Sequence, residues 1–195
     1  LGVIGSSIVL YAAGTVDFHT ADYYNIDELR KIYSSGKPDT WPTPTVDSSV
    51  INFKEIGSLG EMKFPEDNPY SEEKKNLGKT LFFDPRLSGS KQISCASCHD
   101  PELGWADGRR VSYGHDRQTG IRNSITLLNV GYADKIMWDG RAMTLEDQVS
   151  FPMNDTKELN IHPKIAAKNI NKIKEYRPMF EKAFGDSEIT MERIA

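Results

Sequence analysis

The chain has 195 residues, of which 38% are hydrophobic and 27% are charged, values typical of a soluble globular protein. Its length suits one domain of ordinary size or two small ones. The net charge is −4 and lysines and arginines are scattered along the chain, so the basic stripe of a nucleic-acid-binding protein is absent. We therefore expect no nucleic-acid partner.

Residues 1–60 are interpreted as an N-terminal extension. The first 14 residues, LGVIGSSIVLYAAG, are apolar and uncharged but too few to cross a bilayer alone. They predict either the remainder of a signal peptide or membrane anchor, or a buried strand or helix end. A short helical pattern covers residues 26–33, and the Pro/Ser/Thr-rich stretch 36–49 predicts an extended linker.

A helix is predicted to begin after Ser71, which is a good N-cap followed by two glutamates. Leu77 and Leu81, four residues apart, lie on one face of this helix, and Pro85 ends it.

The rest of the chain predicts further helices separated by long loops. Glycines and polar residues dominate residues 104–129, which predicts a long loop. Thr144 opens another helix, and residues 165–175 and 179–184 follow with Pro178 expected to break the run between them. The expected fold is mostly α, with little strand signal.

The last residues resemble the first turn of a helix with Thr190 as its N-cap. We expect the main domain to cover residues 61–185 and residues 186–195 to start a second domain, so that the chain is a fragment of a longer protein.

Cys95 and Cys98, the two cysteines of the chain, stand directly before His99 in the motif CASCH. A disulfide would not require the histidine, and a zinc site would need further ligands for which no second paired motif exists. A thioredoxin-like site should follow a strand in a βαβ unit. Covalent attachment of haem c explains all three residues, because the thiols form thioethers and the histidine binds the iron.

Haem c has two consequences for the rest of the protein. It is attached outside the cytoplasmic membrane, so we expect a periplasmic or otherwise exported domain. The porphyrin also supplies an apolar centre on which long loops can pack. Four methionines downstream could supply a second axial ligand, as in an electron-transfer cytochrome: Met137, Met143, Met153 and Met179.

The segment from Leu77 to Asn160 contains LFFDPRLS, SCASCH, RN, WDGRA and LEDQ in this order. It resembles the N-terminal, peroxidatic haem domain of the bacterial di-haem cytochrome c peroxidase family, which includes MauG-like enzymes. The resemblance implies a cytochrome c-like haem domain that reduces hydrogen peroxide to water.

The resemblance also implies ligand and acid–base roles. Cys95 and Cys98 would hold the haem and His99 would be the proximal iron ligand. His115 would bind the iron in the resting state and leave on activation. Glu158 would move a proton between the peroxide oxygens, and Gln148 would position peroxide or water. On composition alone, His115 would be a solvent-exposed loop histidine, Glu158 an exposed acid flanking a helix and Gln148 an ordinary polar residue of a helix.

Further residues match family positions around the haem. Trp138 would be the tryptophan between the two haems, and Asn123 would contribute to an inter-domain calcium site. Independently of the resemblance, Arg122 and Arg141 are candidates to pair with haem propionates, and surface ion pairing is the alternative for both.

The family carries a second CxxCH in a C-terminal domain, which this chain lacks. The resemblance implies a second haem there, a small cytochrome c or cupredoxin as electron donor, and a homodimer. Two alternatives stay open: a mono-haem electron-transfer cytochrome, and a MauG-like oxidase that modifies a partner protein.

Overall fold

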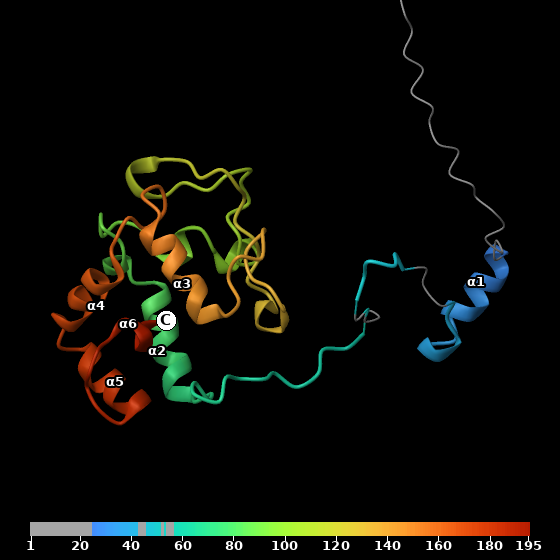
Figure 1. The fold of residues 1–195 in the computed structure, drawn as a ribbon, viewed down its shortest axis with the longest axis horizontal. Coiled ribbons are helices and arrows are strands. Elements are labelled where there is room, and N and C mark those ends of the chain that lie inside the picture. The colour runs from blue at the N-terminus through green and yellow to red at the C-terminus, as the bar shows by residue number, and fades with distance from the viewer. Residues whose placement is uncertain (1–24, 43–45, 52, 54–56) are drawn as a thin grey trace, which may run out of the picture. The chain divides into compact units, whose positions relative to one another are not determined.

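The computed structural model describes residues 25–42, 46–51, 53 and 57–195. The chain forms two units, residues 1–57 and residues 58–195 (Figure 1). The predicted signal or anchor remnant at residues 1–14 lies outside the described residues, as does part of the linker at 36–49. None of the helices in the described ranges is long and apolar enough to span a membrane.

The first unit contains helix α1 (Ile26–Tyr33), at the residues that the sequence predicts. It begins with a capping box, in which the Asn25 side chain accepts from the Asp27 backbone and Glu28 reaches back to the Asn25 backbone. The rings of Tyr33 and Trp41 lie 5.2 Å apart. No residue of α1 is buried, so the helix is held mainly by its own caps.

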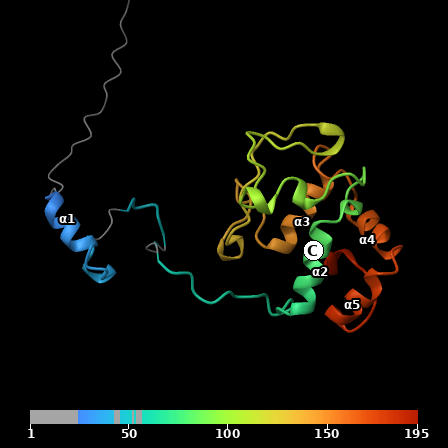
Figure 2. The ribbon, with the colours of Figure 1, turned by 180° about the vertical axis from the view of Figure 1, so that it is seen from behind.

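The second unit is built from helices and long loops, which confirms the predicted fold class. Three isolated bridges join short stretches of loop, and no strand is present in the described part of this unit. Its helices are α2 (Glu72–Phe82), α3 (Leu145–Asn154), α4 (Pro163–Asn171), α5 (Tyr176–Phe184) and α6 (Met191–Ile194). In both views α4 and α5 lie on one side of α2 and the long loops lie on the other (Figures 1 and 2).

The boundaries of α2 follow from its sequence. The Ser71 hydroxyl accepts a hydrogen bond from the Lys74 backbone N–H at 3.1 Å, as expected for an N-cap. Leu77 and Leu81 are both buried on the same face. The helix ends at Phe82, shortly before Pro85 starts a short 3₁₀ turn.

The prediction that Pro178 breaks a helix is wrong. Pro178 is the third residue of α5, where its missing N–H costs nothing because the first-turn N–H groups have no acceptor inside the helix. The interruption lies earlier instead, between the end of α4 at Asn171 and the start of α5 at Tyr176.

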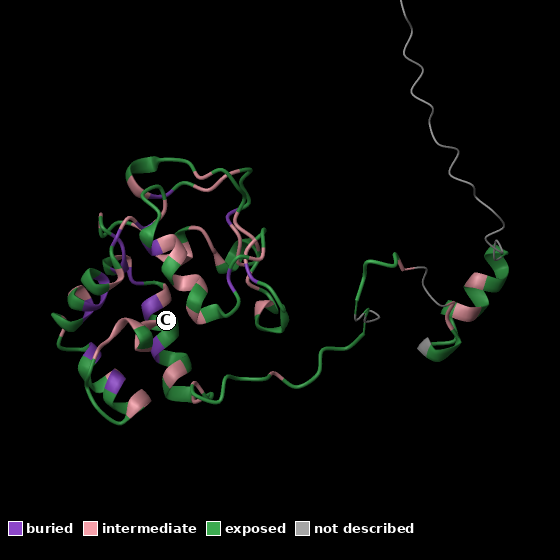
Figure 3. Ribbon diagram, viewed as in Figure 1, coloured by how far each residue is buried: buried purple, intermediate pink, exposed green. Residues whose placement is uncertain are grey.

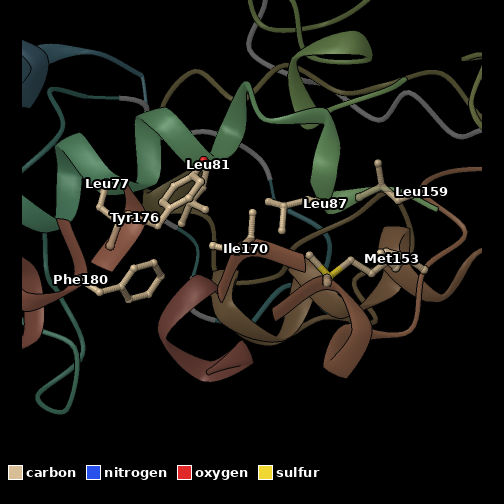
Figure 4. Close-up of a cluster of buried hydrophobic side chains, with 10 residues drawn as sticks. Leu77, Leu81, Leu87, Met153, Leu159, Ile170, Tyr176 and Phe180 are labelled. Atoms are coloured by element: carbon tan, nitrogen blue, oxygen red, sulfur yellow. The ribbon is translucent and has the colours of Figure 1, made fainter. Parts of the chain in front are cut away.

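The hydrophobic core of the second unit lies where α2, α4 and α5 meet (Figure 4). Ala166, Ile170 and Phe180 are completely buried in it. Residues 186–195, predicted to start a second domain, pack against this same core through Ile189, Met191 and Ile194.

The loop-rich part of the unit has almost no hydrophobic core of its own. Within residues 95–143, all of which the structure describes, the buried hydrophobic residues are Ile136 and Ala142. The remainder of this segment is largely half-buried or exposed (Figure 3). Apolar burial is the main favourable term in folding, so this segment needs another apolar partner or many polar ties.

One buried polar network anchors the helical side. The Asp84 carboxylate is 4% exposed and accepts hydrogen bonds from the Tyr176 hydroxyl and the Arg86 guanidinium. Burial alone would raise the pKa of Asp84, but the bonds from Arg86 and Tyr176 outweigh it and hold the pKa below 3.8. This network ties the end of α2 to α5.

We predict that Tyr176→Phe lowers the free energy of unfolding by about 1–3 kcal/mol, because it removes a hydrogen bond to a buried charged group. Since the folded pKa of Asp84 is lowered, its stabilising contribution is complete above pH 3.8 and is lost as the pH falls through the folded value. The difference between wild type and variant should shrink accordingly in denaturant titrations at decreasing pH.

Tyr132→Phe is the matched control for this prediction. The Tyr132 hydroxyl donates to the Gly60 carbonyl in an exposed loop, so its loss should change the stability by less than about 0.5 kcal/mol. Equal losses of stability in the two variants would show that the buried hydrogen bond to Asp84 contributes no more to stability than an exposed one.

Candidate haem site

The CASCH motif forms a tight 3₁₀ turn over Cys95–Ser97. The backbone N–H groups of Cys98 and His99 both donate to the Cys95 carbonyl, at 3.1 and 3.0 Å. Both cysteines are free thiols and half-buried. Burial raises the pKa of Cys95 to about 11 and also raises the pKa of Cys98.

His99 is held in one orientation by a backbone carbonyl. Its Nδ1 lies 3.1 Å from the carbonyl oxygen of Trp105. A carbonyl can only accept, so Nδ1 carries the proton and Nε2 keeps its lone pair for a metal. The ring also lies near Phe82 at the end of α2, with 6.5 Å between ring centroids.

Trp105 aims this carbonyl through an unusual backbone conformation. Its φ is +61°, in the left-handed region that bulky residues rarely occupy, and it follows Gly104 in the same region. Its backbone N–H donates to the Asp100 carbonyl at 2.8 Å. Sequence reasoning missed Trp105, for which the preceding glycine is the one local signal.

The loop that carries His115 lies directly against the segment that carries Glu158. The His115 backbone N–H donates to the Glu158 carbonyl at 2.9 Å. Gly114 makes this approach possible, because a Cβ there would lie 2.0 Å from the Lys157 carbonyl oxygen and 2.7 Å from the Glu158 Cα. The structure thus brings together two residues that are 43 positions apart in the sequence.

The Glu158 segment is fixed from a second side as well. The Gly89 N–H donates to the Leu159 carbonyl at 2.8 Å, and a Cβ on Gly89 would lie 2.2 Å from the Asn160 carbonyl oxygen. Glu158 itself is half-buried. Burial and the nearby Asp155 raise its pKa, and the positive charge of Arg141 opposes this shift. A carboxyl group with a raised pKa holds a proton more readily than an ordinary glutamate, which suits a group that has to accept and then donate a proton.

Cys98 connects the haem-attachment turn to the same region. Its thiol lies 3.7 Å from the carbonyl oxygen of Tyr113, two residues before His115. After burial, the negative charges of Asp107 and Glu158 contribute to the raised pKa of Cys98. The motif, the His115 loop and Glu158 therefore form one site.

Trp138 is joined to Asn123, a residue of the long loop. The indole Nε1 donates to the Asn123 backbone carbonyl at 2.9 Å, and the Asn123 side-chain amide donates to the Arg109 carbonyl at 2.6 Å. Trp138 is 64% exposed, so it is not an ordinary core tryptophan.

The described residues contain no group of three or more His, Cys, Asp or Glu that could hold a metal ion.

Arg122 and Arg141 share one carboxylate. Each places a guanidinium nitrogen 2.7 Å from the Asp139 carboxylate. The hydrogen bond from Arg122, supported by those from Arg141, lowers the pKa of Asp139 to about 2. Two cations with one anion leave a net positive charge that suits a propionate group. Sequence reasoning did not single out Asp139.

Gln148 lies half-buried on α3, the helix that leads directly into the Glu158 segment.

The four methionines considered as axial ligands are dispersed. Met153 is buried in the helical core and Met179 packs against that core, whereas Met143 is 65% exposed. Met137 is half-buried with a φ of +72°.

These residues fit a covalently attached haem. The Cys95 and Cys98 thiols precede a histidine whose Nε2 has no hydrogen-bond partner within the described ranges, and the surrounding loops lack a core that a porphyrin would supply. A second histidine faces inward, with its Nδ1 buried and without a hydrogen-bond partner among the described residues. The fold and the site together define a mostly helical c-type haem domain.

Comparison with known proteins identifies the family. Residues 72–195 match the family described as di-haem cytochrome c peroxidase, and the chain belongs to this family. It is 42% identical over 130 residues to the methylamine utilization protein MauG of Methylophilus methylotrophus, covering 67% of this chain and 39% of that protein. It is also 42% identical over 126 residues to the cytochrome c551 peroxidase of Nitrosomonas europaea, covering 65% and 38%. The chain thus spans about two-fifths of the length of these relatives.

Solved structures agree with this assignment. A MauG-like protein associated with microbial copper homeostasis matches with a TM-score of 0.64 and 29% identity, over 77% of this chain and 45% of that one. The diheme peroxidase BthA from Burkholderia thailandensis matches with a TM-score of 0.54 and 30% identity, over 65% and 35%.

We predict that Gly114→Ala destabilises the domain by about 1–3 kcal/mol, because the new methyl group forces the His115 loop away from backbone atoms of Lys157 and Glu158. Chemical denaturation of the haem-loaded chain measures this change.

Gly120→Ala, in the same loop, is the control, because its Cβ would be 3.9 Å from the nearest carbonyl oxygens. If Gly114→Ala were as mild as Gly120→Ala, the close packing of the two segments would be disproved.

Proposed function

We propose that this chain is the peroxidatic haem half of a cytochrome c peroxidase, which reduces hydrogen peroxide to water. The observation that carries the proposal is the hydrogen bond of 2.9 Å between the His115 N–H and the Glu158 carbonyl. It supports placing a displaceable histidine and a half-buried acid at one site. When bound, the haem supplies an iron that can take up peroxide and exchange electrons.

The attachment of the haem at this site would be permanent. Cys95 and Cys98 would tether the porphyrin through thioethers, and His99 would bind the iron through Nε2. The Trp105 carbonyl keeps the ring from turning and makes the imidazole a stronger donor.

Glu158 would transfer the proton during the reduction of peroxide. It would take a proton from the inner peroxide oxygen and return it to the outer one, so that water can leave. Its burial supports this role, because a carboxyl group with a raised pKa can hold a proton and release it. Gln148 would orient peroxide or water through its side-chain amide.

The exposed cluster around Trp138 would serve electron entry. An exposed indole, fixed by Asn123, offers a path to a partner group. Arg122 and Arg141 would neutralise haem propionates. Asn123 would contribute an oxygen to an inter-domain calcium ion, since its amide nitrogen is engaged with Arg109.

The proposal extends to the whole protein of which residues 61–185 form one haem domain. A second domain would carry a second haem c that accepts electrons from a small cytochrome c or cupredoxin. The protein would work in the periplasm, where haem c is attached, as a homodimer. Residues 1–60 would be an extension that precedes the catalytic part.

A second candidate function is oxidation of residues on a partner protein, as in a MauG-like enzyme. The 42% identity to the MauG of Methylophilus methylotrophus favours it. Turnover of a protein substrate, instead of a small donor, by the full-length enzyme would separate the two functions. The third alternative, a mono-haem electron carrier, would use either a methionine ligand or permanent ligation by two histidines. Met153 and Met179 are engaged in the helical core, and a six-coordinate haem that ignores peroxide in both redox states would favour this alternative.

We predict that the chain matured with haem c retains its colour after denaturation and exceeds the 21.9 kDa mass of the bare polypeptide by one haem. Replacing both Cys95 and Cys98 with alanine should abolish this added mass, whereas Ser97→Ala in the same turn should keep it. A bare-chain mass for the wild type would refute the haem assignment.

We predict that Glu158→Gln lowers the rate of peroxide-dependent donor oxidation by about 10²–10⁴-fold in the full-length enzyme, because glutamine cannot transfer the proton. Glu181→Gln, at an exposed position of α5, is the control and should leave the rate unchanged. An undiminished rate in Glu158→Gln would remove Glu158 from the mechanism.

A further inference from the structure

The two histidines of the site are held in opposite ways. His99 has its Nδ1 engaged by a backbone carbonyl, and its Nε2 makes no hydrogen bond within the part of the chain that the structure describes. His115 has its Nε2 3.3 Å from the Asp116 carboxylate, while its Nδ1 is buried and has no hydrogen-bond partner among the described residues. A histidine that binds a metal firmly usually has its second nitrogen supported by an acceptor. His99 has this support, and His115 lacks it.

The backbone explains why Asp116 can reach the ring of the residue directly before it. Asp116 and Arg117 have φ values of +52° and +57°, so two successive non-glycine residues adopt the left-handed conformation. Aspartate tolerates this conformation better than most residues, but two in a row are strained. The turn folds the Asp116 carboxylate back toward the His115 ring.

The Asp116 carboxylate lies where it can compete with a metal for the Nε2 atom of His115. The His115 side chain is 16% exposed, whereas that of Asp116 is 75% exposed. A carboxylate only accepts, so a hydrogen bond formed across this 3.3 Å contact would use the Nε2 proton and occupy the nitrogen that a metal would use. The rest of the loop is anchored independently, because the His115 N–H stays bonded to the Glu158 carbonyl.

We propose that Asp116 is a positioning residue that competes with the haem iron for His115 Nε2 and makes His115 a releasable ligand. The inference rests on the proposed function, in which His115 binds the iron in the resting state. It adds a local device for release: the imidazole turns between the iron and its own neighbour, while its backbone remains fixed to the Glu158 segment.

The test uses the haem-loaded chain in the ferric state and two readouts that do not require turnover. The ratio of low-spin to high-spin haem reports how much iron is bound by His115. The rate of cyanide binding reports how often the sixth position is open. Whichever state predominates in the wild type, one of these readouts is sensitive.

Asp116→Gly removes the carboxylate and suits a positive φ. We expect it to raise the low-spin ratio, or to slow cyanide binding, by about fivefold, the size of effect of one modest hydrogen bond. Asp116→Asn keeps the size and an accepting oxygen but loses the charge, so it should shift both readouts in the same direction and by less.

Arg117→Gly is the matched control, because it places a glycine at the adjacent left-handed position without removing the contact to His115. If it reproduced the effect of Asp116→Gly, loop flexibility would be the cause and the proposal would be overturned. Unchanged readouts in Asp116→Gly would overturn it as well.

His115→Ala distinguishes a failure of this proposal from a failure of the proposed function on which it rests. If it abolishes the low-spin form while Asp116→Gly has no effect, His115 is a ligand and the role of Asp116 is wrong. If it changes neither readout, His115 does not bind the iron and the proposed resting state fails.

Discussion

Main-chain contacts at residues 157–160 join the loop-rich part of the haem domain to its helical part. The His115 N–H and the Gly89 N–H each donate to a carbonyl of this short segment. Both contacts depend on glycines that leave no room for a side chain, at Gly114 and Gly89. Residues 95–143 bury few apolar side chains of their own, so these ties, together with the proposed covalent haem, would hold them in place.

The same segment gives Glu158 its chemical character. Glu158 is half-buried at the point where the His115 loop meets its backbone, and burial raises the pKa of its carboxyl group. The same short segment therefore joins the two parts of the domain and carries the acid–base group, Glu158. A change in how the His115 loop packs would alter both the position of Glu158 and its readiness to hold a proton.

Charge is distributed unevenly around the site. Arg122 and Arg141 converge on Asp139, which leaves a net positive charge beside the exposed Trp138. The positive charge of Arg141 also acts on Glu158 and partly offsets the raised pKa of that carboxyl group. The arrangement suits a propionate-bearing cofactor whose edge is open to an electron partner, in keeping with membership of the di-haem peroxidase family.

The sequence by itself determined the mostly α fold, the N-cap of α2 at Ser71 and the CxxCH motif at Cys95–His99 on which the haem proposal rests, because caps, hydrophobic spacing and CxxCH are local signals. Motif order also singled out His115 and Glu158 but could not show that they touch. The tertiary structure decided that contact, the Trp105 carbonyl on His99 and the Asp116 carboxylate on His115. These depend on backbone conformations and close approaches between segments far apart in the chain, which no local pattern of residues encodes.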